Sequence, residues 1–393
     1  MKVFIRDMNS CVMRKTDIAR YKISFRAAGH EVVTKLGDSD TVLVWTCAFR
    51  SDFRDYSLKA LNLYQEDSKK RVIACGCLPS IDFELFTKSF PGEYFEWKNE
   101  KKAFKELFDI DLKHALRPVV EKALPVSIEE FKKKNPEVKT TYCDQFVKLF
   151  ISEGCPFKCT YCAERLAFPK YNSFPLQKII AKCKETVENT GITNVVLYGD
   201  CVGEYGKDIG TTLPLLAQEL IESIKGVKIG IKNLHPVHYI EYIDFFIQYL
   251  EEKKMFLLET PIQSASDAVL NLMGRLYTKR DLIKIFDSFR NADFTEIETH
   301  IIAGFPQETR EQFNETVDFI CEYKPKWVLL SGFMESPGMK ARKLRGQIDP
   351  EEKRGRVLSA YERINKEGVI CNYDLCDYSQ ESFSYPFIDE LVY

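Results

Sequence analysis

Residues 153–162 read EGCPFKCTYC, and this stretch places three thiols close together, at Cys155, Cys159 and Cys162. A tight loop with this CxxxCxxC spacing can put three thiolates on three irons of a cubane [4Fe–4S] cluster. The fourth iron then has no protein ligand and can bind a small molecule. A structural zinc site needs four closed ligands, and the next cysteine, Cys183, falls inside an expected helix. The spacing therefore predicts an open-cornered cluster, with zinc or structural cysteines as the alternatives.

Composition limits the class of protein. With 393 residues the chain is long enough for two or three domains, and 45% hydrophobic with 29% charged residues is typical of a soluble globular protein. The net charge of −2 gives no overall basic field for nucleic acid, although a local basic patch is compatible with it. No apolar run is long enough to span a membrane.

Cysteine usage indicates the compartment. The N-terminus, MKVFIRDMNS, does not read as a signal peptide, and thirteen cysteines in such a chain favour thiols and metal over disulfides. We therefore expect a cytoplasmic protein in a reducing environment.

Short apolar runs alternate with amphipathic runs in the first third of the chain. This pattern indicates a parallel sheet covered by helices. The expected strands are residues 2–6, 31–34, 41–46 and 71–74, and the expected helices are residues 16–28 and 53–66.

Cysteines follow three of these strands. Cys11 follows the first strand, Cys47 ends the 41–46 strand, and Cys75 and Cys77 end the 71–74 strand. Because the carboxyl ends of strands in open α/β sheets meet at one crevice, this placement predicts a second metal site. The alternative for each is an ordinary buried cysteine.

Strand–helix alternation resumes at Phe146 and continues to about Glu335. Six βα units predict a partial barrel, whose strand tops carry the chemistry, and the three-cysteine loop follows its first strand. The expected strands are 147–152, 194–198, 227–232, 255–259, 296–302 and 327–331, with helices 176–189, 213–224, 239–252 and 310–322 among those between them.

The CxxxCxxC loop, with an aromatic residue before its last cysteine, resembles the radical S-adenosylmethionine (SAM) superfamily. The resemblance implies that the open iron binds SAM, which is cleaved to a radical that takes hydrogen from an unactivated carbon. Tyr161 lies between the last two cysteines, where its ring can pack against a purine.

The N-terminal segments narrow the resemblance to the methylthiotransferases. Residues 9–11 (NSC), 45–50 (WTCAFR) and 76–79 (GCLP) are similar to that family's cysteine segments, and residues 260–264, 304–309 and 273–277 are similar to its PLQSGS, GFPGET and MxRxY segments. The similarity runs from Lys2 to about Leu344. It implies an auxiliary [4Fe–4S] cluster on Cys11, Cys47 and Cys77.

The same resemblance implies the contacts to SAM. Together with Tyr161, they are Asp200, Gln263, Ser264 and Gly304, at loops whose small or polar residues suit close backbone approach. No catalytic side chain is identified beyond the cofactor ligands.

The chain also departs from the family's pattern. His300 stands where the family has Asp, Asp200 where it has Gln, and Cys183 falls near an expected acidic residue. We interpret His300 as a core group and the pair His235 and His238 as a strand-end cap. Cys75 is extra to the pattern and is a ligand, a neighbour of the ligands or a core residue, whereas Cys371 and Cys376 are taken as structural.

The expected architecture is α/β. An N-terminal open parallel α/β (flavodoxin-like) domain, residues 1–120, precedes a charged linker (121–144) and a partial (βα)6 radical SAM barrel (145–344). Methylthiotransferases usually carry a C-terminal β-barrel domain that helps to grip the substrate, and the remaining extension, residues 345–393, is too short to form one.

The resemblance implies an enzyme that adds a methylthio group to an unactivated carbon. We favour a peptide or protein substrate, because of the short extension and the neutral overall charge, with a transfer RNA (tRNA) adenosine as the alternative. The implied cofactors are two [4Fe–4S] clusters and SAM, and the implied electron donor is a flavodoxin or ferredoxin. Two other hypotheses stay open: a non-catalytic iron–sulfur protein, and a radical enzyme that inserts sulfur without methylating it.

Overall fold

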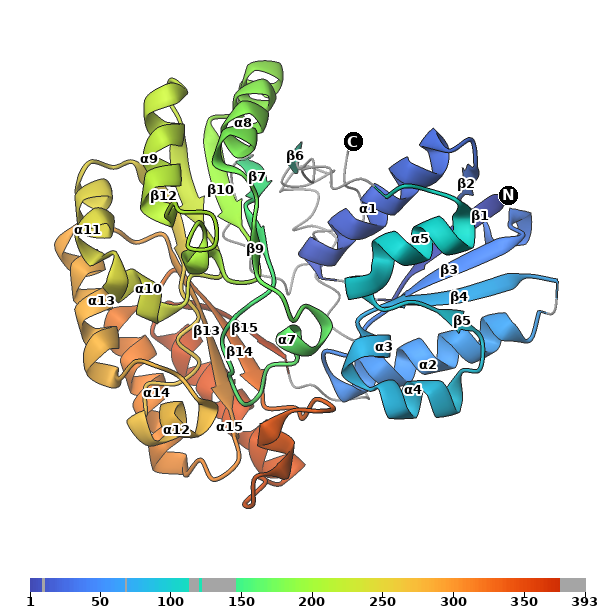
Figure 1. Ribbon diagram of the computed structural model, residues 1–393. Helices are drawn as coiled ribbons and strands as arrows, with labels where there is room; N and C mark the ends of the chain where they lie inside the picture. Colours follow the sequence, from blue (N-terminus) through green and yellow to red (C-terminus); the bar gives the residue numbers. More distant parts are fainter. Residues whose placement is uncertain (9–10, 68, 113–119, 122–145, 375–393) are drawn as a thin grey trace. The chain divides into compact units, whose positions relative to one another are not determined.

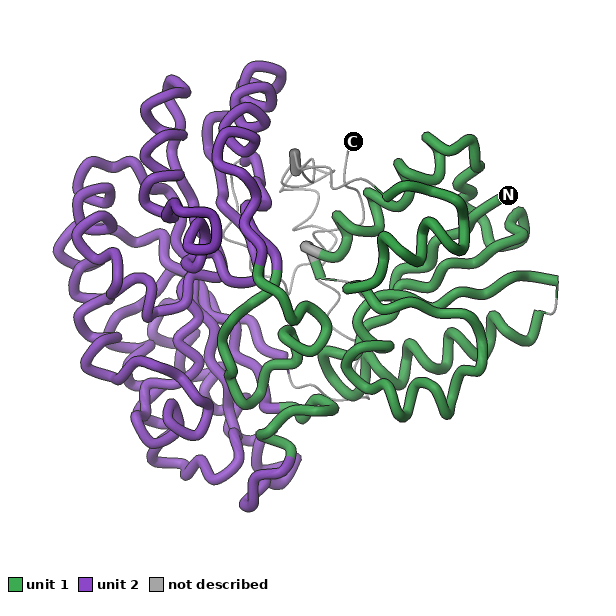
Figure 2. Tube along the Cα trace, in the orientation of Figure 1, with its two compact units in different colours: residues 1–118, 154–171, 334–342 green, residues 119–153, 172–333, 343–393 purple. Residues whose placement is uncertain are grey.

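A computed structural model of the chain describes residues 1–8, 11–67, 69–112, 120–121 and 146–374. The chain divides into two compact units (Figure 2). Unit 1 comprises residues 1–118, 154–171 and 334–342, and unit 2 comprises residues 119–153, 172–333 and 343–393. The three-cysteine loop therefore groups with the N-terminal segment, although the chain places it inside the barrel sequence. Most of the expected linker lies outside the described residues, and the sequence-based domain boundaries stay a prediction.

Unit 1 contains a five-stranded parallel sheet in the order β2-β1-β3-β4-β5. This is the flavodoxin-like strand order, in which the crevice for a ligand lies where β1 and β3 adjoin. Helices α1 and α5 cover one face, and α2, α3 and α4 cover the other (Figure 1). The bounds are β1 Lys2–Asp7, α1 Val12–Ala27, β2 Glu31–Val33, β3 Thr41–Thr46, α2 Ser51–Gln65, β4 Arg71–Gly76, α3 Leu78–Ile81, α4 Phe83–Ser89, β5 Glu93–Tyr94 and α5 Glu100–Phe108.

The core of unit 1 includes residues from its later segments. Ala163, Ala167, Phe168 and Met339 are buried in the same hydrophobic cluster as Trp45 and the β3 and β4 side chains. The loop segment and the 334–342 segment are thus packed into this unit by apolar burial, the main stabilising contribution to folding.

Unit 2 contains an eight-stranded sheet in the order β15-β14-β13-β12-β11-β10-β7-β6. Each neighbouring pair from β7 to β15 is parallel, and β6 adds to the edge in the antiparallel sense. The strands are β6 Val120–Glu121, β7 Phe146–Phe150, β10 Asn194–Tyr198, β11 Lys228–Ile231, β12 Met255–Glu259, β13 Ile297–Ala303, β14 Trp327–Gly332 and β15 Ile370–Asp374.

Helices lie along the outer side of this sheet, as Figure 1 shows for α9, α11, α13 and α14. The helices of unit 2 are α8 Leu176–Thr190, α9 Leu213–Ser223, α10 Pro236–Glu241, α11 Ile243–Glu251, α12 Asp267–Met273, α13 Lys279–Asn291, α14 Arg310–Tyr323 and α15 Pro350–Lys366. The α/β class and the parallel barrel sheet are confirmed.

The structure adds detail that the sequence did not predict. The first barrel strand ends at Phe150, and a short pair, β8 (Ser152–Glu153) with β9 (Asn172–Ser173), closes the base of the three-cysteine loop. The expected helix 239–252 is broken at Tyr242. The strand of the C-terminal extension, β15, pairs in parallel with β14 and becomes a seventh parallel strand.

No helix in the described part of the chain has the length and apolar character that crossing a bilayer requires.

Candidate functional site

Close backbone contacts fix the three-cysteine loop. Gly154 has a φ of +81°, and a Cβ there would lie 2.3 Å from the carbonyl oxygen of Lys170, so only glycine fits. Cys162 N donates to Cys159 O at 3.3 Å, forming a turn. These contacts hold three half-buried cysteines in one loop. Their role as ligands of a cluster stays a prediction.

The loop continues into a short helix that belongs to the core of unit 1. Helix α7, Glu164–Ala167, begins two residues after Cys162 and packs against α3. Ala341 N donates to Thr160 O at 2.9 Å, which ties the 334–342 segment to the backbone between Cys159 and Cys162.

The second cysteine set lies at the carboxyl ends of β1, β3 and β4. Cys11 is the N-cap residue of α1 and is exposed, whereas Cys47 and Cys77 are buried. The β3–β4 register pairs Thr46 with Gly76, so that Cys47 and Cys77 follow adjacent strand ends. A Cβ on Gly76 (φ +91°) would lie 2.4 Å from Thr46 O, so glycine is required there.

The three thiols of this set lie close enough to affect the pKa of Cys47 and Cys77. The pKa of Cys47 is raised to about 12, mainly by burial, and the neighbouring Cys11 contributes to the shift. Burial also raises the pKa of Cys77, to which Cys47, Glu164 and Cys11 contribute. Arg14 lowers the pKa of Cys77, but burial has the larger effect. Thiols buried in this way ionise readily when a metal supplies positive charge. The donor set therefore fits an iron–sulfur cluster.

Glu164 lies close to both cysteine sets. Besides burial, its carboxylate is among the groups that raise the pKa of Cys47, Cys77 and Cys162. The two sets are thus neighbours of the same side chain within unit 1.

The arrangement differs from that of a mononuclear metal site. Among the described residues, no three Cys, His, Asp or Glu side chains are grouped to hold a single ion, and no two cysteines form a disulfide. A cubane spreads its thiolates over different irons, so three spaced cysteines per set suit it.

Cys75 and Cys371 are part of the core. Strand β4 extends through Cys75, which is buried with its Sγ 3.5 Å from Val44 O. After burial, the groups that raise its pKa are Glu100, Asp17 and Asp7. Cys371 is buried in β15, and Cys376 lies outside the described residues.

The predicted SAM contacts lie in unit 2 except for Tyr161. Asp200, Gln263 and Gly304 follow β10, β12 and β13, at the carboxyl edge of one sheet. Gln263 has a φ of +62°, and its N donates to His300 O at 2.8 Å. Ser264 is buried, and its hydroxyl pairs with that of Thr316 at 3.1 Å, so it holds the loop against α14. Contact with SAM stays a prediction for all five residues.

Sequence reasoning missed a buried ionic cluster in unit 2. Lys232 Nζ lies 2.8 Å from Glu298 and 3.1 Å from Glu259, and His300 Nε2 lies 3.9 Å from Glu259. Burial lowers the pKa of His300, and Glu259 opposes that shift. The sequence does contain a signal for this cluster, because Glu259 ends the otherwise apolar strand β12 and Glu298 lies within β13.

The two histidines of the HPVH segment have structural contacts. His235 Nδ1 accepts from Val237 N and caps α10, and His238 Nε2 lies 2.6 Å from Glu204 Oε1. The interpretation as a cap therefore describes His235, although it caps a helix rather than a strand.

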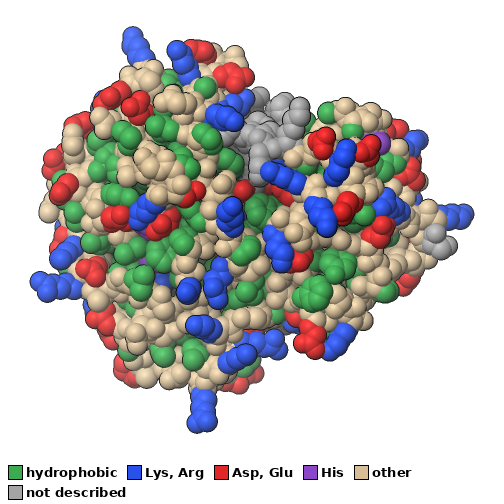
Figure 3. Space-filling model, in the orientation of Figure 1, with side chains coloured by type: hydrophobic (Ala, Val, Ile, Leu, Met, Phe, Trp, Pro, Cys, Tyr) green, Lys and Arg blue, Asp and Glu red, His purple; other side chains and the backbone are tan. Residues whose placement is uncertain are grey.

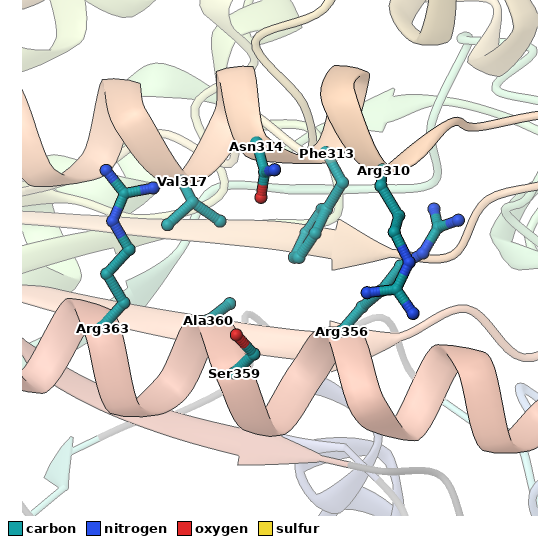
Figure 4. A pocket seen from close by; sticks show the side chains of 8 residues that line it. All are labelled: Arg310, Phe313, Asn314, Val317, Arg356, Ser359, Ala360 and Arg363. Atoms are coloured by element: carbon teal, nitrogen blue, oxygen red, sulfur yellow. The ribbon is translucent and has the colours of Figure 1, made fainter.

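A small pocket lies between α14 and α15 (Figure 4). Three arginines line it, but each has a carboxylate partner: Arg310 pairs with Glu352, Arg356 with Glu308, and Arg363 with Asp318. The pocket therefore offers no uncompensated positive charge to a ligand.

Comparison with known proteins agrees with this geometry. Residues 149–320 match the Radical SAM superfamily and residues 2–95 match Uncharacterized protein family UPF0004. The solved structure of the radical SAM methyltransferase TsrM from Kitasatospora setae has a similar fold, with a TM-score of 0.58 and 13% identity over 86% of this chain and 76% of that one. The cobalamin-dependent SAM radical enzyme OxsB has a TM-score of 0.54 and 14% identity over 93% and 56%. The fold and cysteine loop define a radical SAM enzyme.

Sequence relatives are more specific. The probable threonylcarbamoyladenosine tRNA methylthiotransferase of Methanocaldococcus jannaschii is 31% identical over 92% of this chain and 83% of its own length. That of Pyrococcus horikoshii is 30% identical over 87% and 79%. The human threonylcarbamoyladenosine tRNA methylthiotransferase is 27% identical over 91% of this chain and 61% of its own length. The chain belongs to the radical SAM methylthiotransferase family, whose enzymes use SAM and two [4Fe–4S] clusters.

Proposed function

We propose that this enzyme adds a methylthio group to a modified adenosine of tRNA. The observation that carries the proposal is the similarity, over most of the chain, to tRNA methylthiotransferases from archaea and animals. The peptide substrate favoured above has no such support. One reason for it was the overall charge, but an overall charge does not reveal local basic patches. The other reason was the short C-terminal extension, but strand β15 of that extension belongs to the barrel sheet.

Two cysteine sets have the donors for two clusters. Cys155, Cys159 and Cys162 would hold the cluster that binds SAM, and Cys11, Cys47 and Cys77 would hold the auxiliary cluster. When bound, these groups supply hydrogen abstraction by a SAM-derived radical and a sulfur that is methylated and transferred.

The protein's own residues provide position and a dry environment. Gly154 and Gly76 allow the close backbone approaches that set each cysteine segment. Cys47 and Cys77 are shielded from water, with only 6% and 8% of their surface exposed. Shielding of this kind limits side reactions of a radical with solvent.

Substitution of Cys77 tests the division of labour. We expect Cys77→Ala to lose methylthiolation of tRNA while still cleaving SAM, because the other cysteine set is untouched. Anaerobically reconstituted wild-type protein should hold about eight irons per chain and the variant about four, from the cubane ligand count. Iron analysis and mass spectrometry of tRNA nucleosides are the measurements.

Cys75→Ala is the matched control, since Cys75 is buried two residues away inside β4. It should keep the iron content and the methylthiolation of the wild type. Full methylthiolation by Cys77→Ala would show that Cys77 is not a ligand.

A further inference from the structure

Exposed cations from distant parts of the sequence gather around the three-cysteine loop of unit 1. Lys158 and Lys170 lie in the loop segment, and Lys340 and Arg342 lie in the 334–342 segment, where all four side chains are exposed. The loop segment, residues 154–171, carries three Lys or Arg against a single Glu. This contrasts with the chain as a whole, whose net charge is −2.

One sequence adjacency and two backbone contacts place these cations beside the cysteines. Lys158 directly precedes Cys159. Lys170 is brought back to the start of the loop, because its carbonyl carbon and oxygen lie against Gly154, which directly precedes Cys155. Lys340 and Arg342 flank Ala341, whose N donates to Thr160 O at 2.9 Å.

The 334–342 segment is anchored well enough to present its cations at a defined place. Met339 and Ala341 are buried in unit 1, with 4% and 0% exposure. The Ser51 hydroxyl donates to Glu335 O at 2.8 Å, and the Ser336 hydroxyl donates to Phe49 O. The same segment is therefore attached both to the three-cysteine loop and to the residues that follow Cys47.

Lys158, Lys170 and Lys340 account for most of the positive charge of this surface. In the described residues no carboxylate forms an ion pair with Lys158, Lys170 or Lys340. Arg342 lies 3.6 Å from Glu335, but both side chains are about half exposed, at 47% and 46%, and such pairs contribute little. Glu164, the acid of the loop, is already paired with the buried Arg14.

We propose that Lys158, Lys170, Lys340 and Arg342 form a phosphate-binding surface that holds the RNA backbone beside the radical site. This inference rests on the proposed function. Lys and Arg contacts to phosphates position a nucleic acid without reading its sequence, and they release condensed counterions on binding. RNA backbone held next to the cysteine loop would place the target base within reach of the SAM-derived radical.

The test is the salt dependence of tRNA binding, measured by filter binding with unmodified tRNA and reconstituted protein. The variant changes all four residues to Gln. The logarithm of the association constant falls linearly with the logarithm of the salt concentration. Each lost phosphate contact should make this slope less negative by about 0.7 to 0.9, so the slope of the quadruple variant should be less negative by roughly 3. Its Kd at low salt should rise at least tenfold.

A matched control removes the same charge from unit 2. Lys225, Lys228, Lys253 and Lys254 lie at the amino ends of β11 and β12, and their change to Gln should leave the wild-type slope. A second control keeps the four charges: Lys158→Arg, Lys170→Arg, Lys340→Arg and Arg342→Lys. This charge-keeping variant should have the wild-type slope, which would show that the loss in the Gln variant comes from the lost charge and not from misfolding.

The outcomes separate this inference from the proposed function. If the wild type methylthiolates tRNA and the Gln variant keeps the wild-type slope, the surface is wrong and the function stands. If the slope of the charge-keeping variant is as shallow as that of the Gln variant, the four residues do not act through their charge and the inference is wrong. If the wild type neither binds nor modifies tRNA, both proposals fail.

Discussion

Arg14 is the side chain that most directly connects the two cysteine segments. It is 1% exposed and lies three residues after Cys11. Its guanidinium contacts Asp17 at 3.1 Å and Glu164 at 3.3 Å, and its Cζ lies 3.4 Å from the ring centroid of Phe168. One buried cation therefore joins the start of α1 to helix α7 of the three-cysteine loop.

Replacing Arg14 should be costly. Arg14→Met leaves Asp17 and Glu164 without this partner, and breaking a buried pair in this way typically costs about 3–5 kcal/mol. Urea denaturation followed by circular dichroism measures the free energy of unfolding. Arg26→Met, on the exposed last turn of the same helix, should change it by less than about 0.5 kcal/mol. Equal stabilities for the two variants would contradict the role given to Arg14.

Several residue roles could be predicted from the sequence, and others could not. The spacing of Cys155, Cys159 and Cys162 reports a local loop, which short-range sequence determines. Arg14 and Glu164 are separated by 150 residues, so their ion pair depends on packing that no local pattern reports.

At the scale of elements, helix α15 holds the loop that follows β13. Arg356 on α15 donates to the carbonyl oxygen of Glu308 at 2.9 Å, and its Nη1 lies 3.4 Å from that carboxylate. The Glu308 carboxylate also accepts from Gly304 N at 2.6 Å. Helix α15, in the C-terminal extension, therefore helps to fix Gly304, one of the predicted SAM contacts.

Burial of Glu308 gives unit 2 a pH dependence. Burial raises the pKa of Glu308 from 4.5 to about 7, although Gly304 N and Arg356 oppose the shift. Between these values the folded state keeps a proton that the unfolded state has released. The stability contribution is therefore full below about pH 4.5 and is lost as the pH rises to 7, by up to roughly 3 kcal/mol at about 1.4 kcal/mol per pKa unit.

Glu308→Gln should remove this contribution. The free energy of unfolding, measured by urea denaturation from pH 4.5 to 7, should fall less steeply with pH in the variant than in the wild type. Glu311→Gln, at an exposed position on α14, should keep the wild-type slope. A wild-type slope in Glu308→Gln would show that Glu308 is already ionised across this range.

Most elements were predictable because their apolar patterns are local. The bounds of β3, β10 and β12 agree with the sequence-based prediction to the residue. The place of β15 beside β14 was not predicted, because parallel pairing depends on contacts across the intervening α15. The β8–β9 pair was missed because two-residue strands carry no periodic signal.

At the scale of the whole molecule, charge alone gives little information about the substrate. Acidic and basic side chains are both scattered over the face shown in Figure 3, in keeping with a net charge of −2. The informative feature is local, because unit 1 contains both cysteine sets and the four exposed cations of the proposed phosphate-binding surface. A neutral total is thus compatible with a nucleic-acid substrate.

We propose that this chain transfers a methylthio group to tRNA. The most direct test incubates the anaerobically reconstituted enzyme with SAM, a sulfide source, a reductant and tRNA that lacks the modification, followed by mass spectrometry of the digested nucleosides. We expect a modified adenosine whose mass has increased by a methylthio group in place of hydrogen, and no such product with Cys77→Ala. Cleavage of SAM by the wild type with no change in any nucleoside would contradict it.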